Sequence, residues 1–166
     1  FLRADFASLA EVRRLALAFV AEDRPLHVLV NNAGIMNTSR KLTVDGFEEM
    51  FAVNHLAHFL LTRLLLGRMQ ECAPARIVHV VSNAHAFCKG MRWHDLSYER
   101  EFSAFPAYGH SKLANILFSN ELARRLRGTG LSSNALHPGA VATGIGGNNG
   151  IAGRVVGDPA VQPGMS

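Results

Sequence analysis

The stretch Leu26-His27-Val28-Leu29-Val30-Asn31-Asn32-Ala33-Gly34 joins a short, mostly apolar run to an ending of polar and small residues. An unbroken apolar run of this length is typical of a parallel β-strand that is covered on both faces. The small residues that follow it allow a ligand to approach the backbone closely. The stretch therefore predicts a buried parallel strand whose carboxyl end lies at a ligand site.

Hydrophobic patterns along the rest of the chain predict strands and helices in alternation. Strands are expected at 76–82 and 131–137, with the end of another at 1–6, and helices at 9–21, 44–69 and 107–127. A capping box at Ser8 marks the start of the first helix. Residues 84–106 lack a clear period and predict a surface excursion. The order predicts an α/β fold, a Rossmann-like doubly wound parallel sheet with helices on both faces.

Three polar or small-residue segments fall where the predicted strands end. They are Asn31–Gly34, Ser82 and Pro138-Gly139. In parallel sheets of this type, ligands bind beyond the carboxyl ends of the strands. The agreement of the three positions predicts a ligand site at that edge of the sheet.

The predicted helix 107–127 carries Tyr108 and Lys112 four residues apart, and therefore on one face. A phenol ordinarily titrates near pH ~10, and a fixed ammonium group nearby lowers that pKa. The pair could pass a proton to or from an alcohol or carbonyl oxygen. The alternative is a chance spacing of two half-exposed side chains.

Composition excludes several other classes of protein. The chain has 166 residues, 48% apolar content and a net charge of +4 without a block of like charges, which argues against nucleic-acid binding. Cys72 and Cys88 lack metal-ligand spacing, and we interpret His55 and His58 as packing residues, so no metal site is expected. With no leader pattern and no long apolar span, a cytoplasmic protein without a membrane segment is expected.

Several motifs, taken together, resemble the short-chain dehydrogenase/reductase superfamily over residues 1–143. They are Asn31-Asn32-Ala33-Gly34, Asn54, Ser82, Tyr108-x-x-x-Lys112 and Pro138-Gly139. Residues 45–56 and 110–115 resemble the branch that contains the retinol dehydrogenases and the WW-domain oxidoreductases. The resemblance implies an oxidoreductase that moves a hydride between a nicotinamide cofactor and an alcohol, aldehyde or ketone. It slightly favours NADP over NAD.

The resemblance also implies roles for four catalytic residues. Tyr108 would be the general acid/base, and Lys112 would lower its pKa and hold the nicotinamide ribose. Ser82 would donate a hydrogen bond to the substrate oxygen, and Asn54 would position a water for a proton relay. Two alternatives remain open, because Ser82 could be a polar strand-end residue and Asn54 a structural amide.

The remaining implied contacts are with the cofactor. Asn31, Ala33 and Gly34 would line its adenosine half, and Asp5 would lie at the adenine ring. The turn that contains Pro138, Gly139, Val141 and Thr143 would face the nicotinamide.

The chain also departs from the family pattern. It lacks the Gly-rich turn with which the family begins, and it has His79 and Val81 where the family more often has Asn and Ser. Residues 1–143 are therefore expected to form a partial cofactor-binding domain, and 144–166 a loop or disordered tail. The helices 44–69 and 107–127 resemble those through which family members form homodimers. A catalytically inactive module that acts through this pairing is the alternative function.

Overall fold

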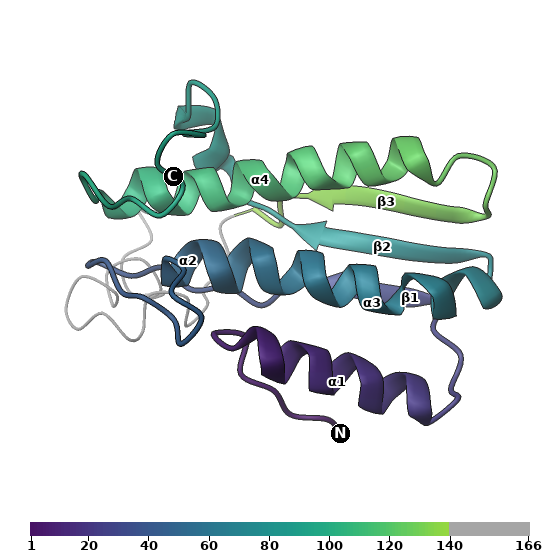
Figure 1. Ribbon diagram of the computed structural model, residues 1–166. Helices are drawn as coiled ribbons and strands as arrows, with labels where there is room; N and C mark the ends of the chain where they lie inside the picture. Colours follow the sequence, from purple (N-terminus) through teal and green to yellow (C-terminus); the bar gives the residue numbers. More distant parts are fainter. Residues whose placement is uncertain (140–166) are drawn as a thin grey trace, which may run out of the picture.

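The computed structural model describes residues 1–139, and residues 140–166 lie outside that description. Figure 1 shows a small parallel sheet with three long helices beside it. The strands are β1 (Val28–Asn31), β2 (Ala75–Val80) and β3 (Leu131–Leu136), paired in parallel in the order β1-β2-β3. The long helices are α1 (Leu9–Ala21), α3 (Ala57–Glu71) and α4 (Ala104–Arg125). The predicted parallel α/β fold is confirmed.

Within the described residues, the helices cover one face of the sheet. Leu29, Ile77 and Leu131 are buried, whereas Val28 and Val30 on the other face are 50% and 53% exposed. The connections from β1 to β2 and from β2 to β3 each move to the neighbouring strand in the same direction across the sheet. Because such connections are right-handed, both place their helices on the same face of the sheet. The prediction that the strand at 26–30 is covered on both faces is therefore wrong for the described chain.

The first six residues form no strand, although the sequence predicted the end of one there. Helix α1 begins and ends as predicted, and Ser8 Oγ caps it by accepting a hydrogen bond from the Glu11 amide at 3.4 Å. Val12 and Ala16 of α1 join the main hydrophobic core with Leu61 and Leu65 of α3. In Figure 1, α3 accordingly lies between α1 and α4.

The long central helix begins five residues later than predicted. Residues 43–48 form a turn that contains Gly46 at φ +82°, and the buried Glu48 carboxylate caps the helix by accepting from the Met50 and Phe51 amides. Three segments then follow without a break: α2 (Glu49–Phe51), the π-helical η1 (Ala52–Leu56) and α3. A carboxylate at a helix N-terminus also favours the start because it interacts with the helix dipole.

The segment Glu49–Glu71 is long and apolar enough to cross a membrane by length and composition alone, and the expected absence of a membrane segment stays a prediction. Half of its most apolar window is buried inside the fold. Met50, Leu61, Leu65 and Met69 are among its buried residues. Core packing therefore accounts for its composition.

The predicted surface excursion is partly internal. It begins with the short 3₁₀ helix η2 (Asn83–Phe87), and it contributes the buried Asp95 and Tyr98. Tyr98 packs with Met50 and Ala107 in a second, smaller hydrophobic cluster. The excursion is thus anchored to the first turn of α4, which begins three residues earlier than predicted.

Candidate active site

Three chain segments meet at the carboxyl ends of β1 and β2. A methyl group built on Gly34 would lie 3.4 Å from both Asn54 Oδ1 and Lys112 Nζ. The loop after β1 therefore lies in van der Waals range of the two polar groups at Gly34. Asn54 belongs to η1 and Lys112 to α4. The structure thus brings Gly34 next to Lys112, which lies 78 positions further along the chain.

Asn54 is fully buried, and its amide group is hydrogen-bonded in several directions. Its Oδ1 accepts from the Ile35 amide at 2.8 Å, and its Nδ2 donates to the Ile35 carbonyl and to Ser111 Oγ, both at 3.0 Å. These bonds attach the loop after β1 to η1 and α4. Asn54 therefore has a structural role, as the alternative interpretation proposed, because its side chain connects these three segments.

Ser82 lies between β2 and η2, and it has two sets of contacts. Its Oγ accepts from the Ala84 amide at 3.2 Å, so Ser82 caps η2. A side-chain hydrogen bond to Ser82 also acts on Tyr108, where it opposes the effect of burial on the pKa of the phenol. Ser82 is therefore both a strand-end cap and a partner of the predicted acid/base.

The electrostatics of Tyr108 and Lys112 differ from the prediction. Burial raises the pKa of Tyr108 above its usual value, and burial lowers the pKa of Lys112 to about 8. Lys112 Nζ lies 5.6 Å from the centre of the Tyr108 ring and donates to the Val80 carbonyl at 3.1 Å. The pKa of Tyr108 is thus raised and not lowered in this structure, because burial outweighs the hydrogen bond to Ser82, and the lowering expected from Lys112 stays a prediction.

Gly109 lies in α4 between these two residues, against η2. A methyl group built there would lie 2.7 Å from the Ala84 carbonyl oxygen and 2.8 Å from Cys88 Sγ. Such distances are closer than side-chain carbons tolerate. Only glycine allows η2, and with it Ser82, to lie this close to α4.

The predicted cofactor residues lie in different environments. Asn31 is 2% exposed, and its Nδ2 donates to Thr62 Oγ1 at 2.9 Å in the core, so its side chain is directed away from the strand-end site. Ala33 is exposed. The Asp5 carboxylate accepts from the Ala7 amide at 2.9 Å in the turn before α1.

Pro138 and Gly139 follow β3 and are exposed, with Gly139 at φ +84°. They lie beyond the carboxyl end of β3, which the sheet places beside the end of β2. Val141 and Thr143 lie outside the described residues.

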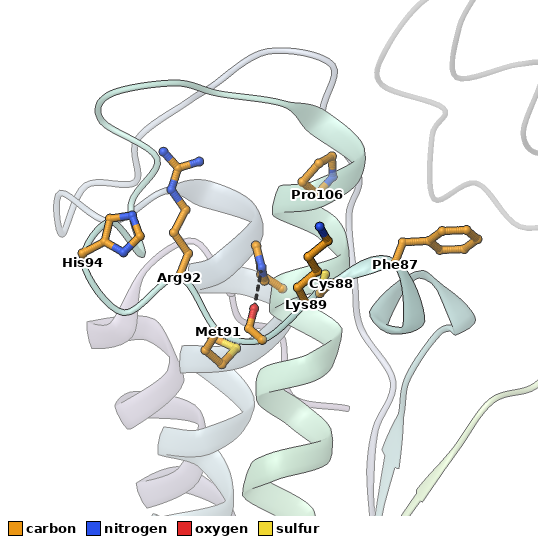
Figure 2. Close-up of a pocket in the computed structure, with 9 residues that line it drawn as sticks. Phe87, Cys88, Lys89, Met91, Arg92, His94 and Pro106 are labelled. Carbon is orange, nitrogen blue, oxygen red and sulfur yellow. Dashed lines mark hydrogen bonds between the residues drawn. The ribbon is translucent and has the colours of Figure 1, made fainter.

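A pocket of about 360 Å³ lies beside the first turns of α4, and Figure 2 shows the residues that line it, which come mostly from the segment 87–94. Its two lining residues from α4, Pro106 and His110, are each two positions from Tyr108. Two positions correspond to about 200° around a helix, so this pocket is on the side of α4 opposite Tyr108 and Lys112. His110 lines this pocket and is hydrogen-bonded to the Gly90 carbonyl at 2.9 Å and to the Tyr98 hydroxyl.

Sequence reasoning missed Ser111 and Asn115, which are buried on α4 and bond to Asn54. The signal that singled out Asn54, a polar residue in an otherwise apolar helix, applies equally to Asn115. Within residues 1–139, no group of three or more His, Cys, Asp or Glu side chains is arranged to hold a metal ion.

The comparisons with known proteins define the class. The sequence profile described as "short chain dehydrogenase" matches residues 1–151. The chain therefore belongs to the short-chain dehydrogenase family, and the resemblance deduced from its motifs is confirmed.

Among individual proteins, retinol dehydrogenase 12 of Mus musculus is 51% identical over 141 residues, which are 85% of this chain and 44% of that protein. A crystal structure of an uncharacterised protein from Mycobacterium paratuberculosis superposes with a TM-score of 0.71 at 38% identity, covering 98% of this chain and 58% of that one. A metagenomic blue fluorescent protein in complex with NADPH superposes with a TM-score of 0.66 at 28% identity, covering 86% of this chain and 53% of that one. The chain thus spans about half the length of the relatives that it matches.

Proposed function

We propose that the chain carries the catalytic centre of an NAD(P)-dependent oxidoreductase, which transfers a hydride between a nicotinamide cofactor and an alcohol or carbonyl carbon. The observation that carries the proposal is the convergence of Asn54, Ser82, Tyr108 and Lys112 at the carboxyl ends of β1 and β2. Membership of the short-chain dehydrogenase family supports the same reaction class.

The donor set at this edge fits the nicotinamide end of such a cofactor. An ammonium group has three N–H donors, and the structure gives Lys112 one acceptor, the Val80 carbonyl. Ribose hydroxyls are suitable acceptors for the others. Gly34 lies next to Lys112 and presents backbone without a side chain on this edge of the sheet. The cofactor supplies or accepts the hydride, and the protein supplies orientation and proton transfer.

In the direction of carbonyl reduction, Tyr108 donates its hydroxyl proton to the substrate oxygen while the carbonyl carbon gains the hydride. The raised pKa of Tyr108 keeps this proton in place at neutral pH, so the side chain is ready to act as an acid. With a pKa of about 8, Lys112 is mostly protonated at pH 7, and its charge stabilises the phenolate that remains. Ser82 donates to the oxygen on which charge develops.

The substrate that we propose is an apolar primary alcohol or its aldehyde, because relatives with 50% and 51% sequence identity are named retinol dehydrogenases. NADPH is the cofactor to test first, because a structural relative is described in complex with it. The cytoplasmic location stays a prediction.

Cofactor binding to the purified, folded chain tests the proposal. Fluorescence titrations with NADPH and NADH should show saturable binding, and Lys112→Ala should weaken it at least about tenfold, as expected when charge-assisted hydrogen bonds are lost. Lys89→Ala is the matched control, because Lys89 is exposed and lines the pocket on the opposite side of α4. Absence of binding at millimolar cofactor, or equal binding by Lys112→Ala, would overturn the proposal.

A homodimer through α3 and α4 is the second candidate role, and exposed apolar residues support it. Phe59 of α3 and Leu117 of α4 are 40% and 43% exposed, and the Phe59 ring lies 4.9 Å from that of Phe118. Sedimentation equilibrium should detect a dimer that Leu117→Lys dissociates. Leu17→Lys on α1, where Leu17 is 65% exposed, should leave the dimer intact. A monomer for the unaltered chain at micromolar concentration would contradict this role.

A further inference from the structure

Asn54 occupies the middle of a helical segment in which the regular hydrogen-bond ladder is shifted. The segment η1, Ala52–Leu56, is π-helical, whereas the residues on either side of it are α-helical. A π segment is frequently found at functional sites, and it changes which carbonyl groups are paired within the helix. The position of Asn54 therefore depends on contacts from outside its own helix.

Asn115 supplies the first of these contacts, to the main chain. Its Nδ2 donates to the Asn54 carbonyl oxygen at 2.7 Å, and both residues are buried. The Asn115 Oδ1 faces the other way and accepts from His55 Nδ1 at 2.9 Å. Because the Asn115 amide nitrogen is committed to a carbonyl, Oδ1 must be the atom that faces His55, and His55 Nδ1 carries the proton.

The imidazole of His55 is well suited to this role. Burial lowers its pKa, so the ring is neutral at pH 7. The rings of Phe51, Phe59 and Phe118 surround it at centroid distances of 5.2 to 6.2 Å. A neutral ring that is fixed in this way keeps one nitrogen as a permanent donor to Asn115.

Ser111 supplies the second contact, to the side chain of Asn54. Ser111 Oγ accepts from Asn54 Nδ2 at 3.0 Å and donates its own proton to the Tyr108 carbonyl at 2.7 Å. One hydroxyl thus connects the Asn54 amide group with the main chain of the predicted acid/base. Tyr108, Ser111, Lys112 and Asn115 have the spacing i, i+3, i+4 and i+7, so one face of α4 carries them all.

We propose that Ser111 and Asn115, with His55 behind Asn115, are positioning residues that hold Asn54 at both its side chain and its main chain, and so fix it relative to Tyr108 and Lys112. We refer to these four residues, Asn54, His55, Ser111 and Asn115, as the α4 network. The inference rests on the proposed function for its consequence, but its structural content can be tested separately.

The first arm of the test needs no cofactor. In ¹⁵N-labelled chain, the Asn54 side-chain amide protons should be protected from exchange with solvent. Ser111→Ala and Asn115→Asp should each reduce that protection, the first by removing an acceptor and the second by removing the donor to the Asn54 carbonyl while keeping an acceptor for His55. Ser111→Thr, which keeps the hydroxyl, should restore it. Unchanged protection in both variants would overturn the proposal.

The second arm measures NADPH affinity in the same variants. Ser111→Ala and Asn115→Asp should weaken binding about five- to tenfold, the effect expected from losing one buried hydrogen bond that orients the site. Ser119→Ala is the matched control, because Ser119 is also buried on α4 but pairs with Ser133 Oγ at 3.0 Å, away from Asn54. It should lower thermal stability by a similar amount without changing affinity.

The two proposals fail in different ways. If the unaltered chain binds no NADPH, the proposed function fails and the exchange measurement still decides the α4 network. If it binds NADPH and the two variants lose no more affinity than Ser119→Ala, the positioning role is wrong while the function stands.

Discussion

Two groups of buried polar side chains lie about one helical turn apart along the central helix, and they differ in how completely they are hydrogen-bonded. Among the described residues, every buried side-chain nitrogen and oxygen of the α4 network has a hydrogen-bond partner. The second group, which we call the sheet cluster, lies between α3 and the sheet and consists of Asn31, His58, Thr62 and His79.

The sheet cluster holds several orphaned atoms. Asn31 Oδ1, His79 Nε2 and both ring nitrogens of His58 are buried without a well-formed hydrogen bond, although a weaker interaction with the Asn54 main chain acts on the His58 ring. A buried polar group without a partner costs the desolvation free energy that a paired one recovers. The comparison shows that the effect of a buried histidine or asparagine depends on whether its polar atoms are hydrogen-bonded. The α4 network can orient a catalytic residue. The sheet cluster instead lowers the free energy of unfolding, and it lowers it further as the pH falls.

The largest effect of any single substitution is expected from breaking the paired group. Asn115→Leu removes the donor to the Asn54 carbonyl and the acceptor for His55, and leaves both partners buried. We expect the free energy of unfolding in urea at pH 7 to fall by about 3 kcal/mol. The same substitution at the exposed Asn120 should change it by less than about 0.5 kcal/mol. A loss below about 1 kcal/mol for Asn115→Leu would remove the distinction between the two groups.

The next effect is a loss of stability in mild acid, and it belongs to the sheet cluster. Burial lowers the pKa of His58 to about 3 and that of His79 to about 4. The unfolded chain, with histidine pKa values near ~6.5, therefore binds more protons between pH 4 and pH 6.5, and stability falls as the pH drops through this window. Above about pH 7.5 the two rings contribute almost no pH dependence, because the histidines of the unfolded chain are then largely neutral as well.

Equilibrium unfolding from pH 7.5 to pH 5 measures this slope. We expect a loss of about 1.4 kcal/mol per pH unit for each of the two rings once the pH is below 6.5. His55 and His110, whose pKa values are also lowered, add to it in the same direction. His58→Leu should reduce the slope, and a stability independent of pH over this range would show that the sheet cluster is not dry.

The smallest effects are expected when histidine is replaced by leucine at positions 55 and 58. They give the most direct comparison of the two groups, because the two positions lie within one helical turn. His58→Leu removes two buried nitrogens that make no well-formed hydrogen bond, and should raise the free energy of unfolding at pH 7 by about 1 kcal/mol. His55→Leu leaves Asn115 Oδ1 without its donor and should lower it by about 1 kcal/mol. Thermal melts at pH 7 give both values, and effects of the same sign would contradict the reading of the two groups.

Much of the site could be predicted from the sequence, and the limits have physical reasons. The strand ends at Asn31 and Ser82 and the pair Tyr108 and Lys112 follow from patterns of two and four residues, which the fold preserves. The inward direction of Asn31 was not readable, because the unbroken apolar run predicted burial on both faces, whereas the structure buries only Leu29 and Asn31 of the four strand residues. The π segment was not readable either, because Ala52–Leu56 contains no glycine or proline to mark a break in the α-helix.

The electrostatic error has a different origin. Spacing shows that Tyr108 and Lys112 are neighbours, but the pKa of each depends on how far the whole fold excludes water from both. The central helix was extended to Val44 because its apolar side chain continues the helical pattern, yet Val44 is 86% exposed in the turn. Such errors arise where the environment of a side chain, and not its type, decides its role.

Gly109 gives the Ser82–Tyr108 pair a mechanical property. The main chain of α4 at this residue lies directly against the Ala84 carbonyl, with no side chain between the two backbones to absorb a shift. Ser82, as the cap of η2, is therefore attached to α4 as part of one rigid body. The relative position of the two main chains that carry Ser82 and Tyr108 is set by this direct backbone contact, so an engineer who reshapes this site can vary its walls but must keep residue 109 without a side chain.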